Sequence, residues 1–187
     1  MRLFVALEIP AAVRENLAAL IRELRPLAPQ AKWVRAEKLH VTLKFIGEVP
    51  AQKAGAIRAA LARLRGEGML ELRFRGLGFF PNEKRPRVFW AGIESGAGLA
   101  RLAAEIEASL APLGIAPEER AFTPHLTLAR FPTPGLPEEL RAAVRENNSR
   151  DFGELRATEF RLVESRLKPA GAEYTSLATF PLASVEA

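Results

Sequence analysis

Apolar residues recur at the spacing of an amphipathic helix in two long segments of the chain. The first segment begins after Pro10 and places on one face Val13, Leu17, Leu20, Ile21 and Leu24. The second ends at Gly114 and carries Leu99, Leu102, Ile106, Leu110 and Leu113. Both spacings follow the helical period, and proline before a helix and glycine after one suit the two ends. The pattern therefore predicts two long amphipathic helices.

A strand-like run precedes each of these helices, and the two runs are related by a shift of 85 positions. Moving Phe4-Val5-Ala6 by this distance gives Phe89-Trp90-Ala91, within the run from Val88 to Ile93. A second pair of helices is predicted after Pro50 and Pro137, with apolar positions Ile57, Leu61 and Leu64 in one and Leu140 and Val144 in the other. Strand-like stretches follow at 70–80 and 158–167, and the run 174–182 has no counterpart in the first half. The order β-α-β-α-β is therefore predicted twice, with one extra strand at the end.

This repeated order predicts an α+β fold of two lobes related by a pseudo-twofold axis. We expect one bilobal domain over 1–187, with approximate internal repeats 1–86 and 87–187 that meet near the charged loop 82–86. Each lobe should be a small, largely antiparallel sheet with helices on its outer face, and the two sheets should face each other across a central cleft. A chain of 187 residues is long enough for one compact unit or two intertwined lobes.

The composition excludes cysteine chemistry and argues against a membrane span and a signal peptide. The chain has no cysteine, which excludes disulfides, a thiol nucleophile and thiolate metal sites. No stretch approaches the roughly 18 uninterrupted apolar residues of a membrane span, and Glu8 and Pro10 interrupt the N-terminus too early for a signal peptide. We expect a cytoplasmic monomer with no membrane partner.

Positive charge exceeds negative charge by five, and 21 of the 27 cationic residues are arginine. A basic surface favours polyanions, and arginine matches phosphate with paired donors. Coding bias or thermal adaptation explains the arginine content equally well. Charge alone therefore establishes no role with nucleic acid.

The two histidines of the chain each begin a tetrapeptide of the pattern His-x-Thr-Leu, His40-Val41-Thr42-Leu43 and His125-Leu126-Thr127-Leu128. On a strand, residues i and i+2 share a face, so each His projects with its Thr while the apolar pair is buried behind them. One lone strand histidine is more often structural than catalytic, but two identical sites in duplicated segments favour chemistry. If the lobes face each other, one cleft holds two imidazoles and two hydroxyls.

Such a cleft suits a phosphodiester. Imidazole exchanges protons near neutral pH, so one neutral ring can activate water or a hydroxyl while the other, protonated, supports the leaving oxygen. The hydroxyls of Thr42 and Thr127 can bind the phosphate oxygens, although β-branched residues also occur in strands for packing alone. No metal or cofactor is needed for this chemistry.

Several further residues are candidates for the rim of this cleft. Lys44 shares the alternation of His40 and can reach the cleft, or it is an exposed lysine at a strand end. Arg130 needs a bulge or the end of its strand to face the same way as His125. Four more residues could stack on a base or line a groove, although aromatic residues beside apolar runs are usually core: Trp33, Arg35, Phe79 and Phe80.

The stretches 33–47 and 122–130 resemble the 2H phosphoesterase superfamily, and within it the RNA 2',3'-cyclic phosphodiesterases, also called 2'-5' RNA ligases. Ile46 stands where leucine is the more frequent residue. The resemblance implies hydrolysis of RNA 2',3'-cyclic phosphate ends to 2'-phosphates, with His40 as proton donor, His125 as proton acceptor and Thr42 and Thr127 on the phosphate. It also implies reversible 2'-5' ligation.

Three interpretations stay open at this stage. The first is the cofactor-free RNA phosphodiesterase, with tRNA fragments among the candidate substrates. The second keeps the same chemistry but assigns a small cyclic nucleotide as substrate. The third is a non-catalytic protein that binds RNA in the basic cleft, for which salt-dependent binding that survives loss of either histidine is expected.

Overall fold

The computed structural model describes residues 1–183, which form four helices and nine strands. The helices are α1 (Ala11–Leu24), α2 (Ala54–Ala62), α3 (Ala97–Leu110) and α4 (Glu138–Glu146). The strands are β1 (Arg2–Glu8), β2 (Lys32–Trp33), β3 (His40–Glu48), β4 (Leu70–Phe80), β5 (Val88–Ser95), β6 (His125–Arg130), β7 (Asp151–Ala157), β8 (Glu159–Lys168) and β9 (Gly171–Pro181). None of the four helices is long and apolar enough to cross a membrane.

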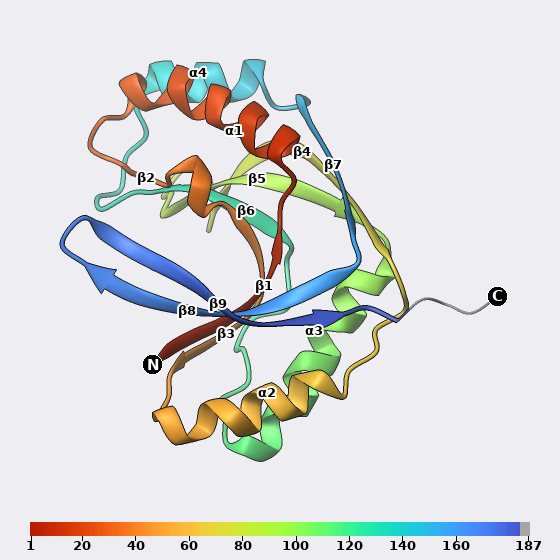
Figure 1. Ribbon diagram of the computed structural model, residues 1–187. Coiled ribbons are helices and arrows are strands. Elements are labelled where there is room, and N and C mark those ends of the chain that lie inside the picture. Colours follow the sequence, from red (N-terminus) through yellow and green to blue (C-terminus); the bar gives the residue numbers. More distant parts are fainter. Residues whose placement is uncertain (184–187) are drawn as a thin grey trace.

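The strands form two antiparallel sheets, and helices cover the outer face of each. One sheet has the order β3-β1-β8-β9 and the other the order β2-β6-β5-β4-β7. In Figure 1, α1 and α4 lie together on one side of the strands and α2 and α3 on the opposite side. Helix α1 packs against β7 of the five-stranded sheet, whereas α3 packs against β3 of the four-stranded sheet. The predicted α+β class with two largely antiparallel sheets is confirmed.

The two lobes exchange elements between the halves of the sequence. Strand β4 belongs to the first half but pairs with β5 and β7 of the second, and β8 of the second half pairs with β1. The helices cross in the same way, since α1 covers the second sheet and α3 the first. Neither half of the chain therefore builds a sheet and helical layer from its own elements alone. The lobes are intertwined, and the repeat boundary near 82–86 stays a prediction about sequence.

The hydrophobic pattern does not predict two of the strands, β7 and β2. Strand β7 lies just before the predicted run 158–167, which corresponds to β8. Its burial alternates incompletely, with Phe152, Leu155 and Ala157 buried and Gly153 between them, so the apolar period is irregular. Strand β2 has only two residues, too few for any period to show.

The predicted apolar faces of the long helices do form the core. Val13, Leu17, Leu20, Ile21 and Leu24 of α1 are all buried. In α3 the same holds for Leu99, Leu102, Ile106 and Leu110, while Leu113 lies beyond its end and is partly buried. Full burial of a leucine side chain contributes about 1.5–3 kcal/mol. These faces therefore hold the helices on the sheets and leave the opposite sheet faces for the site.

The internal repeat has a different offset in the first strands than the sequence predicted. Ala6 pairs with Thr42 in the same way that Trp90 pairs with Thr127, and Glu8 pairs with His40 as Gly92 does with His125. The shift between β1 and β5 is therefore 84 residues, one fewer than between the histidines. A slip of one residue exchanges the faces of a strand: Val5 and Phe89 are both fully buried, whereas Phe4 lies against His40.

Replacing Gly92 by alanine should destabilise the fold at the second histidine. A Cβ at Gly92 would lie 2.4 Å from the carbonyl oxygen of Arg75 on β4, so the two strands must separate, at about 1–3 kcal/mol. Gly55 in α2 has open space at the same atom, and Gly55→Ala should stabilise by about 0.4–1 kcal/mol. Chemical denaturation of both variants measures the two signs; a Gly92→Ala protein as stable as the parent would contradict the packing described here.

Candidate active site

A β-bulge follows the threonine of each His-x-Thr-Leu strand. In β3, Thr42 pairs with Ala6 and Lys44 with Val5, so that Leu43 has no partner on β1. In β6, Thr127 pairs with Trp90 and Ala129 with Phe89, and Leu128 is left out in the same way. A bulge adds one residue to one strand and resets the alternation of faces beyond it. The two motifs therefore share a local backbone irregularity as well as a sequence.

The first bulge turns Lys44 away from the histidine. Cross-strand partners share a face of the sheet, and Lys44 is opposite the buried Val5. The side chain of Lys44 is 1% exposed, and its Nζ donates to Glu107 and to the carbonyl of Ala116. The prediction that Lys44 shares the face of His40, or is exposed at a strand end, is wrong because strict alternation stops at Leu43. Lys44 does border the cavity that Thr42 and His125 line, and its role in substrate binding stays a prediction.

The second bulge turns Arg130 toward the histidine. Arg130 is opposite Val88, two residues along β5 from Trp90, which is opposite Thr127. The exposed guanidinium thus stands on the sheet face that carries Thr127 and His125. In β3 the corresponding position is Phe45, which is opposite Phe4 and 46% exposed. One half of the site therefore ends in a cation and the other in an exposed aromatic ring.

Both imidazoles are fixed by the same backbone hydrogen bond. Nδ1 of His40 is 2.8 Å from the carbonyl oxygen of Lys38, and Nδ1 of His125 is 2.8 Å from that of Thr123. A carbonyl can only accept, so Nδ1 must carry the hydrogen in each ring. The other nitrogen, Nε2, is then left to exchange protons with a substrate. The arrangement suits either an acid or a base.

His40 lies in an aromatic surrounding on the four-stranded sheet. Its ring stacks on Phe4 at 4.7 Å between centroids and meets Tyr174 of β9 edge-on at 5.4 Å. Burial lowers the pKa of His40 below its ordinary value, and the hydrogen bond to the Lys38 carbonyl opposes this shift in part. In the free protein at neutral pH the ring is therefore mainly uncharged.

His125 has a matching aromatic neighbour on the five-stranded sheet. Phe80 meets its ring edge-on at 4.9 Å and also contacts Trp90 at 5.3 Å. Trp90 can lie flat in this place because Gly78 has no side chain; a Cβ there would be 2.2 Å from the indole. The indole Nε1 of Trp90 is buried and has no hydrogen-bond partner among the described residues. Of the four rim candidates, Phe80 thus adjoins the histidine.

The other rim candidates take different places. Phe79 is buried in the core, in line with the expectation for aromatic residues beside apolar runs. Trp33 is partly buried against Phe89, with its Nε1 donating to the carbonyl of Ala28. Arg35 is exposed at the turn that leads to His40.

A cavity of about 340 Å³ joins the two motif strands. Thr42 of β3 and His125 of β6 both line it, together with Arg120, Phe122 and Thr123 from the segment before β6. His40 lines a second hollow of about 190 Å³ with Glu8, Arg161 and Tyr174. Thr42, which shares the sheet face of His40, borders the cavity of His125, so each motif contributes a residue to that cavity.

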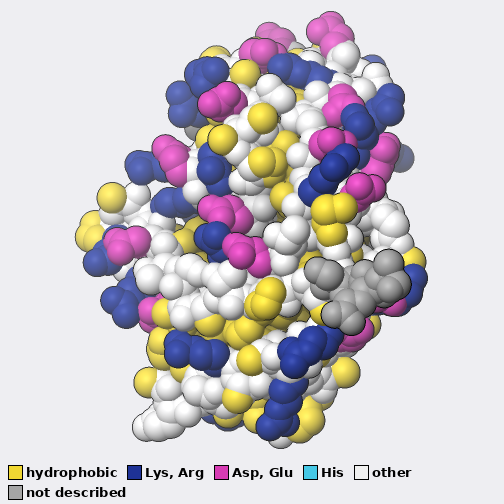
Figure 2. All heavy atoms as spheres, turned by 45° about the vertical axis from the view of Figure 1, so that its right-hand side comes forward, with side chains coloured by type: hydrophobic (Ala, Val, Ile, Leu, Met, Phe, Trp, Pro, Cys, Tyr) yellow, Lys and Arg dark blue, Asp and Glu magenta, His cyan; other side chains and the backbone are white. Residues whose placement is uncertain are grey.

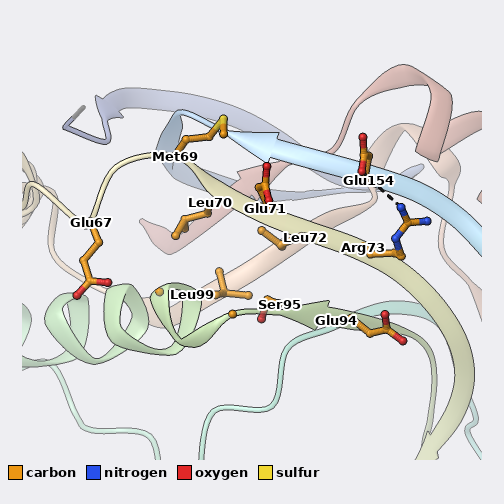
Figure 3. A pocket seen from close by; sticks show the side chains of 12 residues that line it. Glu67, Met69, Leu70, Glu71, Leu72, Arg73, Glu94, Ser95, Leu99 and Glu154 are labelled. Carbon is orange, nitrogen blue, oxygen red and sulfur yellow. Dashed lines mark ion pairs between the residues drawn. The ribbon is translucent and has the colours of Figure 1, made fainter. Parts of the chain in front are cut away.

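A larger hollow lies away from both motifs and has the wrong charge for phosphate. It measures about 660 Å³ and lies between the edge of β4 and the start of α3 (Figure 3). Four carboxylates line it, and its one arginine, Arg73, is paired with Asp151 and Glu154. Its lining residues are Glu67, Met69, Leu70, Glu71, Leu72, Arg73, Glu94, Ser95, Gly96, Gly98, Leu99 and Glu154. Carboxylates at this density repel an anion.

The rest of the surface does not single out another site. On the face drawn in Figure 2, basic and acidic side chains are interspersed rather than gathered into one patch. Within residues 1–183, no group of three or more His, Asp or Glu side chains is placed to hold a metal ion.

The residues that sequence reasoning missed are the neighbours of His40: Phe4, Phe45, Glu8, Arg161 and Tyr174. Their signal is the strand order β3-β1-β8-β9, which no local pattern contains.

Known proteins share this fold and much of this sequence. The model of the 2'-5' RNA ligase superfamily matches residues 13–169. A protein of Archaeoglobus fulgidus named RNA 2',3'-cyclic phosphodiesterase is 36% identical over 180 residues, 96% of this chain and 99% of its own. A Thermus thermophilus protein of the same name is 38% identical over 196 residues, 97% of this chain and 90% of its own.

Solved structures agree with the sequence matches. TT0787 of Thermus thermophilus has a TM-score of 0.82 at 36% identity, with both chains covered completely. LigT of E. coli, solved with 3'-AMP, has a TM-score of 0.77 at 30% identity over 97% of both chains. The resemblance to the 2H phosphoesterases is thereby confirmed. The chain belongs to the 2'-5' RNA ligase superfamily.

The burial of His40 predicts the direction of its titration. Because burial penalises the charged ring, His40 should titrate below its ordinary pKa of 6.5 in the folded protein. The unfolded chain takes up this proton at higher pH, so acidification below about 6.5 should favour unfolding. NMR of the ring protons measures the midpoint, and His125→Gln assigns the signals because the chain has only two histidines. A His40 midpoint at or above 6.5 would contradict the described surroundings.

Proposed function

We propose that this protein is a metal-independent RNA 2',3'-cyclic phosphodiesterase that uses His40 and His125 as an acid–base pair. The observation that carries the proposal is the identical presentation of the two rings. Each begins a bulged strand, each has Nδ1 bound to a carbonyl two residues earlier, and each shares a sheet face with a threonine. The relatives named RNA 2',3'-cyclic phosphodiesterase support the choice of substrate.

Hydrolysis divides the proton transfers between the two rings. His125 accepts a proton from water through Nε2, and the water oxygen forms a bond to phosphorus. The bond from phosphorus to the 3' oxygen breaks, and His40 gives that oxygen a proton. The products are a 2'-phosphate and a free 3'-hydroxyl. His40 is mainly uncharged before binding, so it takes up its proton beside the anionic phosphate, which favours the charged ring.

The surrounding side chains suit the substrate on either side of the phosphorus. Thr42 and Thr127 donate to the non-bridging oxygens, and Arg130 offsets the charge that develops on them. The exposed Phe45, which stacks on Phe4 at 6.3 Å, offers a surface for a base. Lys44 borders the same cavity as Thr42 and His125, but its ammonium is held by Glu107 and by the carbonyl of Ala116.

The same site can run the joining reaction. A 5'-hydroxyl in place of water would attack the phosphorus of the cyclic end and form a 2'-5' bond, with the same two proton transfers. A small 2',3'-cyclic mononucleotide fits the same chemistry, and comparison of rates on a mononucleotide and an oligonucleotide separates the two substrates. tRNA fragments, a monomeric state and a cytoplasmic setting remain proposals of the same kind.

Replacement of either histidine by alanine should lower turnover by roughly 10²–10⁴. The assay uses an oligoribonucleotide with a 2',3'-cyclic end, in chelator, and identifies the product isomer. The parent protein should yield the 2'-phosphate at an undiminished rate without free metal. Binding of RNA that survives both substitutions, with no turnover in the parent, would favour the non-catalytic interpretation instead.

The rate should depend on pH as a bell, because one ring must be charged and the other neutral. His40→Ala should remove the alkaline limb, since that limb marks the pH at which the donor has lost its proton. Turnover of the parent and of His40→Ala from pH 5 to pH 9 tests the assignment. An alkaline limb that persists unchanged in His40→Ala would mean that another group donates the proton.

A further inference from the structure

Lys44 is a buried cation that the proposed reaction does not use. Its Nζ donates to Oε1 of Glu107 on α3 at 2.9 Å and to the carbonyl oxygen of Ala116 at 2.7 Å. Oε1 of Glu118 lies 3.8 Å away. A charge held in the interior needs such partners, and here two of them come from the same short segment of chain.

That segment, residues 115–124, leads directly into His125. It is tied to β3 at Ala116 by Lys44 and at Glu118 by the backbone N–H of Phe45, which donates to the Glu118 carboxylate at 3.3 Å. The N–H of Glu118 in turn donates to Glu107 at 2.9 Å. The segment then passes along the cavity and ends at Thr123, whose carbonyl binds Nδ1 of His125. The chain between Ala116 and Thr123 therefore connects an anchor on β3 with the carbonyl that holds the second imidazole.

The segment before His40 is held on the opposite motif strand by backbone groups alone. Val34 N–H donates to the carbonyl of Leu128 at 2.8 Å, and Trp33 pairs with Ala129. Ala129 stands at the position in β6 that Lys44 occupies in β3, directly after the bulge. Each histidine is therefore approached by a segment anchored on the strand of the other histidine, but only the approach to His125 depends on a side-chain cation.

We propose that Lys44 is the positioning residue for His125. By holding residues 115–118 against β3, it sets the place of the acceptor imidazole relative to the strand that carries His40 and Thr42. Its effect on turnover rests on the proposed function, but its effect on the position of the ring does not. A displacement of about 1 Å in a reacting group can lower the rate by roughly 10².

Lys44→Met tests this role with little risk to the fold. The thioether fills similar space, and Glu107, which is 31% exposed and still accepts from Glu118, is left partly in water. Glu118→Ala provides a second, milder variant, because it loosens the same segment while Lys44 keeps Glu107. Lys168→Met, at the exposed end of β8 where the ammonium lies 3.8 Å from Glu173, is the matched control.

The expected result separates the two histidines. In Lys44→Met the NMR ring signals of His125 should shift while those of His40 stay, and kcat on the cyclic-ended oligonucleotide should fall by roughly 10–100-fold with KM changed less than about threefold. Glu118→Ala should move the same His125 signals by less, and Lys168→Met should move neither ring.

Three results would overturn the proposal. They are a folded Lys44→Met protein with unchanged His125 signals, equal movement of both histidines, and a rise in KM alone, which would assign Lys44 to substrate binding. If the parent protein turned over no cyclic phosphate, the proposed function would fail. The ring signals would still decide the positioning role.

Discussion

The site depends on the bulge that follows the threonine in each motif strand. Without it, strict alternation would put Lys44 on the sheet face of His40 and would turn Arg130 away from the face of His125. The bulge instead sends Lys44 and Ala129 into the interior and brings Phe45 and Arg130 to the front. It thereby also creates the anchoring points at which each strand holds the segment that approaches the other histidine. The same β-bulge in β3 and β6 thus determines which side chains stand beside the histidines and where the two approaching segments are anchored.

Each motif strand holds the segment that leads to the other histidine, and the exchange of elements between the lobes fixes the two strands relative to each other. If each half of the chain built its own sheet and helices, the two histidines would lie in two separate units joined by a linker. The pairing of β4 with β5 and of β8 with β1, together with the crossing of α1 and α3, gives both lobes a shared core. The relative position of the two motif strands is then fixed by packing rather than by a flexible connection, which suits the acid–base chemistry that we propose.

Much of the fold follows from local patterns, and the remainder depends on pairing. The helical period located the buried faces of α1 and α3, and the duplicated motif indicated two lobes, because both signals lie within short stretches of sequence. The exchange of β4 and β8 depends on contacts between residues far apart in the chain, which no period encodes. The same limit explains the offset of Phe4: sequence identity aligned it with Phe89, while hydrogen-bond register aligns Val5 with Phe89.

The candidate site divides in the same way. His40, Thr42, His125 and Thr127 could be found from sequence because i and i+2 share a face within one uninterrupted stretch. Lys44 was misplaced because a bulge leaves no clear sequence signal in Leu-Lys, and Arg130 could be assigned only on the condition of a bulge. Tyr174, which packs on His40 from β9, lies 134 residues along the chain and enters only through the order of the sheet.

The decisive question is whether a single phosphate lies between the two imidazoles. Titration of the protein with a nucleoside 2'-monophosphate, followed through the ring protons of both histidines, answers it directly. Shared binding predicts that His40 and His125 respond together, with one common dissociation constant and a rise in the pKa of His40 beside the anion. A response from one ring alone, or two different dissociation constants, would mean that the two motifs serve separate sites.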